Sequence, residues 1–218
     1  MKVKWYGHSA FLITSDQGIK IILDPYEPGA FGGKLSYGKI MDGADLVLVS
    51  HDHADHNHTA GLPGSPSLVK GSGSKTIKGI TVKGIPTFHD PSKGSERGAN
   101  TIFTFKVDGI QVCHLGDLGH VLTEKELSEV GPVDLLLTPV GGYFTIDPKE
   151  ATKVAEQIKP RVLIPMHFKT EKCEFPIAPV EEFLKEKARV KRLQASEATF
   201  TKASLPALTE VLVLNPAL

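Results

Sequence analysis

Cysteine is scarce in this 218-residue chain, which contains only Cys113 and Cys173. The two residues have no metal-ligand spacing, and isolated thiols of this kind are typical of a reducing compartment. No hydrophobic run approaches the ~18 residues that predict a membrane span. The first residues, MKVKW, lack the apolar stretch of a signal peptide. We therefore expect a cytoplasmic protein that has no membrane partner.

Net charge is absent as well, because 25 Lys and Arg residues balance 25 Asp and Glu residues. A balanced chain has no general electrostatic attraction to nucleic acid or to an anionic membrane. We therefore expect a small-molecule substrate and no nucleic-acid partner. With 40% hydrophobic residues and no low-complexity run, the chain can bury a core, and we expect a single domain over residues 1–218. Whether it forms a homo-oligomer stays open at this stage.

The first half of the chain is rich in predicted strands, whereas strands alternate with helices in the second half. Apolar or alternating runs predict strands at residues 3–6, 10–14, 19–23, 46–50, 80–85, 101–107, 110–115, 133–138, 161–165, 190–193 and 210–214. Asp108-Gly109 predicts a two-residue hairpin. Helices are expected after Thr123, from Asp147 to about residue 158, and over residues 179–187, with Thr123 and Asp147 as N-caps. This order predicts helices packed on mixed sheets.

Histidine is concentrated immediately after the apolar run at residues 46–50, in the string SHDHADHNH at residues 50–58. Side chains two residues apart at a strand end point the same way, so His51 and His53 can chelate one ion. Asp55 and His56 lie beyond the turn and can face a second ion. Burying this many polar groups without a partner would be costly. Imidazole and carboxylate ligands without thiolate suit Zn²⁺, Mn²⁺ or Fe²⁺, and we therefore predict a metal site.

The string His51-Asp52-His53-Ala54-Asp55-His56 resembles the H-x-H-x-D-H signature of the metallo-β-lactamase-fold hydrolases. Three later segments match in order, each just past a predicted strand: Pro86-Thr87-Phe88-His89, Leu115-Gly116-Asp117 and Pro165-Met166-His167. The resemblance implies an α/β fold, an αββα four-layer sandwich of two mixed β-sheets flanked by helices, with the site along one sheet edge. It also implies that one ion is held by His51, His53 and His89, the other by Asp55, His56 and His167, with Asp117 between them. We expect two divalent ions, Zn²⁺ first, with Mn²⁺ or Fe²⁺ as the alternatives.

A narrower resemblance is to a small bacterial and archaeal branch that includes ascorbate-6-phosphate lactonase-like proteins and uncharacterised hydrolases. It rests on Trp5-Tyr6-Gly7-His8-Ser9, Pro139-Val140-Gly141-Gly142-Tyr143-Phe144-Thr145 and Pro165-Met166-His167-Phe168, and so covers most of the chain. At 218 residues, we expect no additional domain of the kind that the nuclease members carry. It is also shorter than the lactonases, so their substrate cannot be carried over.

The expected activity is hydrolysis. Two ions would lower the pKa of a bridging water, and the resulting hydroxide would attack a small ester, lactone or phosphoester, with Asp55 and Asp117 orienting it and transferring its proton. The alternatives are a mononuclear iron-dependent oxidoreductase and a nuclease of the same fold. Di-iron redox members have a Glu where this chain has His53, which favours hydrolysis.

Four other residues are candidates for substrate contacts or for supporting the ligands. His8 lies in a turn between two predicted strands, and Asp24 resembles the family's Asp that orients a metal-binding His. Gly141 and Gly142 could offer N–H groups to an anionic substrate or simply form a tight turn. We expect His114 to be a packed, hydrogen-bonded residue, and His58 and His120 to lie behind the ligands or in solvent.

Overall fold

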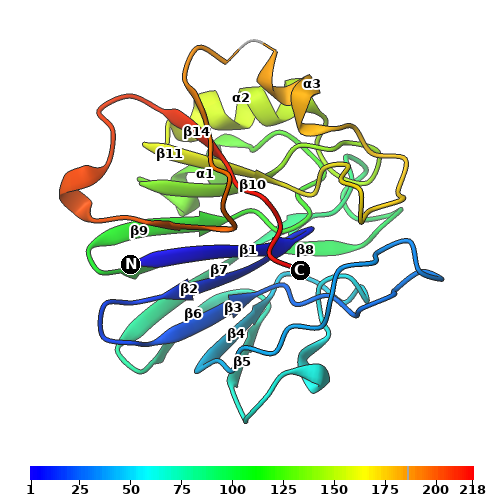
Figure 1. Ribbon diagram of the computed structural model, residues 1–218. Helices are drawn as coiled ribbons and strands as arrows, with labels where there is room; N and C mark the ends of the chain where they lie inside the picture. The colour runs from blue at the N-terminus through cyan, green and yellow to red at the C-terminus, as the bar shows by residue number, and fades with distance from the viewer. Residues whose placement is uncertain (186) are drawn as a thin grey trace.

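Two mixed β-sheets pack face to face in the computed structural model, which describes residues 1–185 and 187–218 (Figure 1). One sheet has six strands in the order β13-β1-β2-β3-β4-β5, and the other has eight in the order β12-β14-β11-β10-β9-β8-β7-β6. Most of the large apolar side chains form one core that runs between the sheets and under the helices. The predicted fold class, a sandwich of two mixed sheets, is confirmed.

The six-stranded sheet consists of β1 (Lys2–Gly7), β2 (Ala10–Thr14), β3 (Lys20–Leu23), β4 (Leu46–Val49), β5 (Ser67–Lys70) and β13 (Glu197–Thr199). Strands β1 to β3 are antiparallel, and β3 to β5 are parallel. Every side chain of β4 is buried, as its unbroken LVLV run predicts for a strand covered on both faces. The chain leaves β4 directly into the histidine-rich string.

The eight-stranded sheet consists of β6 (Gly73–Ile77), β7 (Ile80–Phe88), β8 (Ala99–Val107), β9 (Ile110–His114), β10 (Leu135–Pro139), β11 (Val162–Met166), β12 (Val190–Arg192) and β14 (Glu210–Val213). Strands β6 to β9 are antiparallel, whereas β9, β10, β11, β14 and β12 are parallel neighbours. The predicted hairpin joins β8 to β9, with Asp108 at φ 50° and Gly109 at φ 76°. Two central residues of positive φ are what a type I′ turn requires.

Three α-helices, α1 (Glu124–Val130), α2 (Pro148–Ile158) and α3 (Val180–Leu184), pack on the main core beside the eight-stranded sheet (Figure 1). Thr123 and Asp147 each form the capping box that the sequence predicts for α1 and α2. The outer face of the six-stranded sheet buries a second apolar cluster, which in the described residues is covered by loops and the short 3₁₀ turn η1 (Thr59–Gly61). Another 3₁₀ turn, η2 (Lys202–Ser204), precedes β14. The layer outside this sheet is therefore built of loops.

The elements that sequence patterns did not predict are the short strands β5, β6 and β13. Most of their side chains are exposed, so they lack the apolar alternation that marks a strand. The helix expected over residues 179–187 is shorter, at Val180–Leu184, and residue 186 lies outside the described residues.

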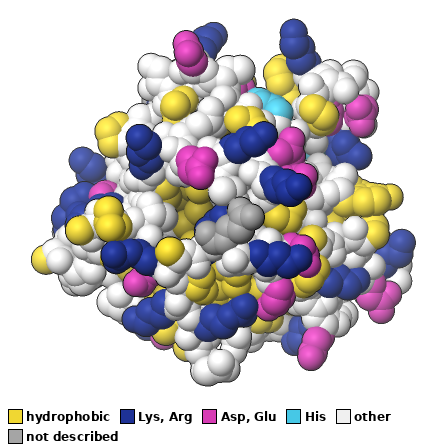
Figure 2. All heavy atoms as spheres, turned by 90° about the horizontal axis from the view of Figure 1, so that it is seen from above, with side chains coloured by type: hydrophobic (Ala, Val, Ile, Leu, Met, Phe, Trp, Pro, Cys, Tyr) yellow, Lys and Arg dark blue, Asp and Glu magenta, His cyan; other side chains and the backbone are white. Residues whose placement is uncertain are grey.

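Charges of both signs are interspersed over the described part of the face seen from above (Figure 2), in keeping with the balanced composition. Among the described residues, no helix is long and apolar enough to cross a membrane.

Candidate metal centre

The candidate metal ligands meet at one edge of the sandwich, where the loops following several strands lie together (Figure 1). His51 follows β4 of the six-stranded sheet, whereas His89, Asp117 and His167 follow β7, β9 and β11 of the eight-stranded sheet. Both sheets therefore contribute, where the resemblance had implied a single sheet edge. A backbone hydrogen bond of 2.9 Å from Thr101 to Ser50 joins the two sheets beside the site.

Three overlapping groups of side chains could each hold an ion, because their ligand atoms lie within 4.8 Å of one another. The groups are His51, His53 and His89; His8, Asp55, His56 and His167; and His51, His56 and Asp117. All seven residues that the resemblance implies as ligands are thus brought together. His8 is an additional member, since its Nε2 lies 3.0 Å from Asp55 Oδ2 and its ring centroid lies 4.1 Å from that of His167.

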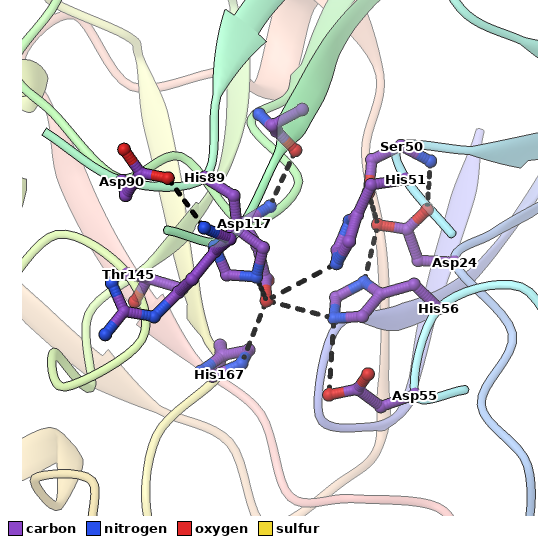
Figure 3. A network of polar contacts seen from close by, with 12 residues as sticks. Asp24, Ser50, His51, Asp55, His56, His89, Asp90, Asp117, Thr145 and His167 are labelled. Atoms are coloured by element: carbon purple, nitrogen blue, oxygen red, sulfur yellow. Dashed lines mark hydrogen bonds and ion pairs between the residues drawn. The ribbon is translucent and has the colours of Figure 1, made fainter. Parts of the chain in front are cut away.

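Asp117 lies at the centre of the cluster (Figure 3). Its Oδ2 is 3.9 Å from His51 Nε2 and 3.3 Å from His89 Nε2, both from the first group. The same oxygen is 3.2 Å from the Nε2 atoms of His56 and His167, both from the second group. One carboxylate oxygen therefore faces imidazoles of both groups.

Asp24 is fully buried behind the ligands, and its carboxylate accepts four hydrogen bonds. Oδ1 accepts from the Ser50 backbone N–H at 2.7 Å, and Oδ2 accepts from the Ser50 hydroxyl at 2.7 Å. Oδ2 also accepts from His56 Nδ1 at 3.0 Å and from His114 Nε2 at 2.9 Å. Because His56 Nδ1 donates to Asp24, Nε2 is the ring nitrogen that faces Asp117, which is the ring orientation that a metal ligand needs.

Ser50 orients the ring of His51 in the same way. Its hydroxyl donates to Asp24, so its oxygen is free to accept from His51 Nδ1 at 2.9 Å. His51 Nε2 then faces the cluster. Asp24 thereby supports His51 through Ser50 and His56 directly, one residue from each group of ligands.

Burial and the neighbouring charges set the protonation of the cluster. Burial lowers the pKa of His51 to about 3 and that of His8 to about 4, with nearby imidazoles adding to the effect. Burial also opposes the charged form of His56, but the carboxylates of Asp117 and Asp55 outweigh it and hold the pKa of His56 well above its usual range. Burial would raise the pKa of Asp117, yet His167 and His56 hold it well below the usual carboxyl value. His51 and His8 are thus neutral and the Asp117 carboxylate is ionised, which are the forms in which these groups bind metals.

The unpartnered buried atoms of the candidate ligands fit a metal. Among the described residues, His51 Nε2, His56 Nε2, Asp55 Oδ1 and Asp117 Oδ1 are buried without a hydrogen-bond partner. Buried polar atoms are almost always satisfied, so four exceptions on neighbouring side chains need an explanation. Imidazole nitrogens and carboxylate oxygens are the donors that Zn²⁺ and similar divalent ions take.

Sequence and structure comparisons place the chain in a family. Residues 2–167 match the model of the beta-lactamase superfamily domain. A UPF0173 metal-dependent hydrolase from Thermococcus kodakarensis is 33% identical over 233 aligned positions, which cover 90% of this chain and 98% of the relative. The chain belongs to the metallo-β-lactamase superfamily.

Solved structures of other superfamily members agree. A Thermotoga maritima protein, provisionally classed as a Zn-dependent hydrolase of this superfamily, is 36% identical, with a TM-score of 0.80 over 98% of this chain and 97% of its own. Igni18, a metallo hydrolase from Ignicoccus hospitalis, shares the fold at 22% identity, with a TM-score of 0.64 over 99% of this chain and 95% of its own. The relatives from Thermococcus kodakarensis and Pyrococcus abyssi, at 33% and 34% identity, are metal-dependent hydrolases, and this superfamily member is one as well.

The remaining histidines of this metallo-β-lactamase superfamily member lie outside the three groups. His114 is buried and donates to Asp24. His120 accepts a long hydrogen bond, 3.4 Å, from the Phe88 backbone, and its ring contacts that of Phe88. His58 is half-buried beside Gly61 and packs on η1 rather than on the ligands.

Gly141 and Gly142 form a buried turn after β10. A Cβ on Gly141 would lie 2.2 Å from the His167 carbonyl oxygen, so only glycine permits this approach to a ligand-bearing loop. The Gly141 carbonyl accepts from Ala178, and the Gly142 carbonyl accepts from Phe144. Whether their N–H groups bind substrate stays a prediction.

Two supporting residues escaped the sequence analysis. Asn100 Oδ1 accepts the Asp117 backbone N–H at 3.0 Å, while its amide donates to Thr87 and to the Leu115 carbonyl. Asp90 is fully buried and accepts four backbone N–H bonds from the loop at residues 92–97. The only sequence signals were a polar residue at the start of the run at 101–107 and an Asp next to His89, neither of which is specific.

Proposed function

We propose that this protein is a dinuclear hydrolase that holds two Zn²⁺ ions and cleaves a small ester, lactone or phosphoester. The observation that carries the proposal is the position of Asp117 Oδ2, which lies 3.2–3.9 Å from imidazole nitrogens of both ligand groups. A carboxylate between two sets of neutral or hydrogen-bonded imidazoles is the arrangement that a bridged pair of divalent ions requires.

The proposed ligands divide by group. His51, His53 and His89 would hold one ion, Asp55, His56 and His167 would hold the other, and Asp117 would contact both. His53 is the exposed member of the first group, whereas the second group is buried throughout. The first ion would therefore be the one open to solvent and substrate.

Ions bound there supply Lewis acidity, which lowers the pKa of water and polarises a carbonyl or phosphoryl oxygen. Asp55 is placed to accept the proton of the attacking water on Oδ1, which has no hydrogen-bond partner among the described residues. His8 holds the other oxygen, Oδ2, at 3.0 Å. Burial would raise the pKa of Asp55, but His56 and His8 keep it below the usual carboxyl range, so the group is ionised at neutral pH. The role of Asp55 in this scheme is that of a general base.

A small molecule is the proposed substrate class, for two reasons. The chain has no net positive charge to attract nucleic acid. The cavity beside the ligands has a volume of about 430 Å³, within the range typical of small-molecule sites.

The test is the metal content per chain, measured by mass spectrometry on protein purified without added metal and again after incubation with Zn²⁺. We expect about two ions in the native chain and the loss of one or both in Asp117→Ala. Asp134→Ala is the matched control, because Asp134 is a buried, hydrogen-bonded carboxylate outside the cluster. A native content near one would replace the dinuclear proposal with a mononuclear site, and a content of zero after incubation would refute metal binding altogether.

A further inference from the structure

The cavity beside the ligands has an aromatic wall, which the hydrolytic chemistry does not require. Of its lining residues, His53, Asp55, His89, Asp117 and His167 belong to the metal centre. The aromatic wall consists of Phe31, Tyr143, Phe144 and Phe175. Water and a small polar ester would gain nothing from four aromatic rings, so this wall indicates what kind of substrate the site takes.

The four rings form a continuous chain of edge-to-face contacts. Phe175 lies 5.4 Å from both Phe31 and Phe144, and Phe144 lies 4.7 Å from Tyr143, with interplanar angles of 70–77°. Phe175 is buried and also contacts the His8 ring at 5.9 Å, which connects the aromatic chain to the ligand cluster. The aromatic wall is therefore buried at Phe175, beside the ligand cluster, and exposed to solvent at its rim, which consists of Phe31 and Tyr143.

The rim residues are held in a backbone conformation that large side chains rarely adopt. Phe31 has φ 56° and Tyr143 has φ 65°, and the two residues are 50% and 65% exposed. Left-handed backbone at a non-glycine residue costs about 1 kcal/mol or more, and such residues cluster at binding sites. Two aromatic side chains are therefore exposed to solvent at the edge of the cavity beside the ligands.

The loop that carries Phe31 is tied to the loop that carries Phe175. Glu174 N–H donates to the Lys34 carbonyl at 2.8 Å, and Ser36 N–H donates to the Lys172 carbonyl at 2.9 Å. The two loops are thus joined by backbone hydrogen bonds along one side of the cavity, which holds Phe31 and Phe175 near each other.

Two cations, Lys34 and Arg97, also line the cavity. The Lys34 ammonium has no ion-pair partner among the described residues, and the Arg97 guanidinium has only the exposed carboxylate of Glu96, at 3.4 Å. Arg97 is held in place by Asp90, whose Oδ2 accepts the Arg97 backbone N–H at 2.8 Å. Asp90 thus fixes the backbone of Arg97, and a weakly paired guanidinium that lines a cavity is suited to bind an anionic group.

We infer that the substrate of this site is an amphipathic anion: an ester or lactone whose acyl part carries an apolar, ring-sized group and a carboxylate or phosphate. The apolar group lies against the aromatic wall, and the anion pairs with Arg97 and Lys34. The inference rests on the proposed hydrolytic function and adds the specificity to it.

The experiment compares four methyl esters that differ in one feature at a time: the monomethyl esters of β-phenylglutaric and glutaric acids, methyl β-phenylbutyrate, and methyl butyrate. The Zn²⁺-loaded protein is used, and methanol release is followed by NMR. The monomethyl ester of β-phenylglutaric acid is expected to have the highest kcat/KM, about tenfold or more above each ester that lacks the ring or the carboxylate. A second readout is calorimetric binding of the dianions β-phenylglutarate and glutarate.

Two variants separate the two features. Tyr143→Ala should lower the kcat/KM preference for the β-phenylglutarate monoester over the glutarate monoester about tenfold. Arg97→Gln should lower the kcat/KM preference for the β-phenylglutarate monoester over methyl β-phenylbutyrate to a similar degree. Leu208→Ala and Arg192→Gln, which remove an exposed apolar and an exposed cationic side chain outside the cavity, should leave both preferences at the native value.

The inference is overturned if the phenyl-bearing monoester has no advantage, or if the dianions bind the native protein and both variants equally. Failure of the proposed function gives a different result, since none of the four esters would then be hydrolysed while the binding preference for β-phenylglutarate could still be measured.

Discussion

Replacing Asp24 by Asn tests whether the ligands are positioned by the chain itself. The carboxylate accepts three hydrogen bonds on Oδ2 and one on Oδ1. An amide has one acceptor oxygen, so its best orientation keeps the Oδ2 set and leaves the Ser50 N–H, now 2.7 Å away, facing an NH₂ group. One buried bond is lost, and the others no longer benefit from a full negative charge, which together reduce the free energy of unfolding by about 2–4 kcal/mol.

The effect on metal binding should be larger than a general loss of stability explains. Asp24 holds His56 directly and His51 through Ser50, so both ligand groups lose orientation, and we expect metal affinity to fall about 10–100-fold. The assays are competition with a chromophoric chelator for affinity and urea unfolding in EDTA for stability. Asp134→Asn is the control, since it should reduce stability but leave affinity unchanged. The reasoning is refuted if Asp24→Asn binds Zn²⁺ within twofold of the native protein.

Two further predictions concern stability. In Gly116→Ala, at φ 57°, the new Cβ would lie 2.4 Å from Asn100 Oδ1 and 2.6 Å from Ser50 Cβ. We therefore expect the free energy of unfolding, measured in urea, to fall by about 2–4 kcal/mol and Zn²⁺ to bind more weakly. Native-like values for both would contradict this close packing around Gly116. Burial would raise the pKa of Asp134, but the Gln111 N–H and the Lys202 ammonium lower it. The contribution of Asp134 to the free energy of unfolding is therefore fully present above its unfolded-state pKa of about 4 and is lost as pH falls through the lower folded-state pKa. Stability in EDTA should therefore fall less steeply below about pH 4 in Asp134→Asn than in the native chain, and parallel curves would exclude this carboxylate as the cause.

Local sequence patterns were sufficient for the elements whose determinants are local. The LVLV run of β4, the capping boxes at Thr123 and Asp147, and the Asp108-Gly109 hairpin each depend on a few adjacent residues. Strands β5, β6 and β13 depend instead on pairing with β4, β7 and β1. Their side chains are mostly exposed, so their sequences lack the apolar alternation that would predict this pairing. The strand order within each sheet is non-local in the same way.

The residues of the candidate site also differ in whether local sequence patterns could predict them. The side chains that could bind metal were found because histidine and aspartate directly after apolar strands are conspicuous. Their supports were found only in part, because these contacts join distant segments: His114 donates to Asp24 across 90 residues, and Asn100 holds Asp117 across 17. The aromatic wall as a unit was not predicted, since Phe31, Tyr143 and Phe175 come from three separate loops.

The two ligand groups differ in how firmly the chain holds them, and this difference predicts unequal metal affinities. In the second group, Asp24 fixes His56 and His8 fixes Asp55, and every member is buried. In the first group Ser50 fixes His51, but His53 is exposed. Ordering a ligand on binding costs free energy, so the first ion should bind more weakly and exchange first. Stepwise Zn²⁺ titration should therefore show two phases, with His53→Ala abolishing the weaker one and leaving the tighter one in place. A single phase in the native chain, or loss of both ions in His53→Ala, would show that the two groups bind as one unit.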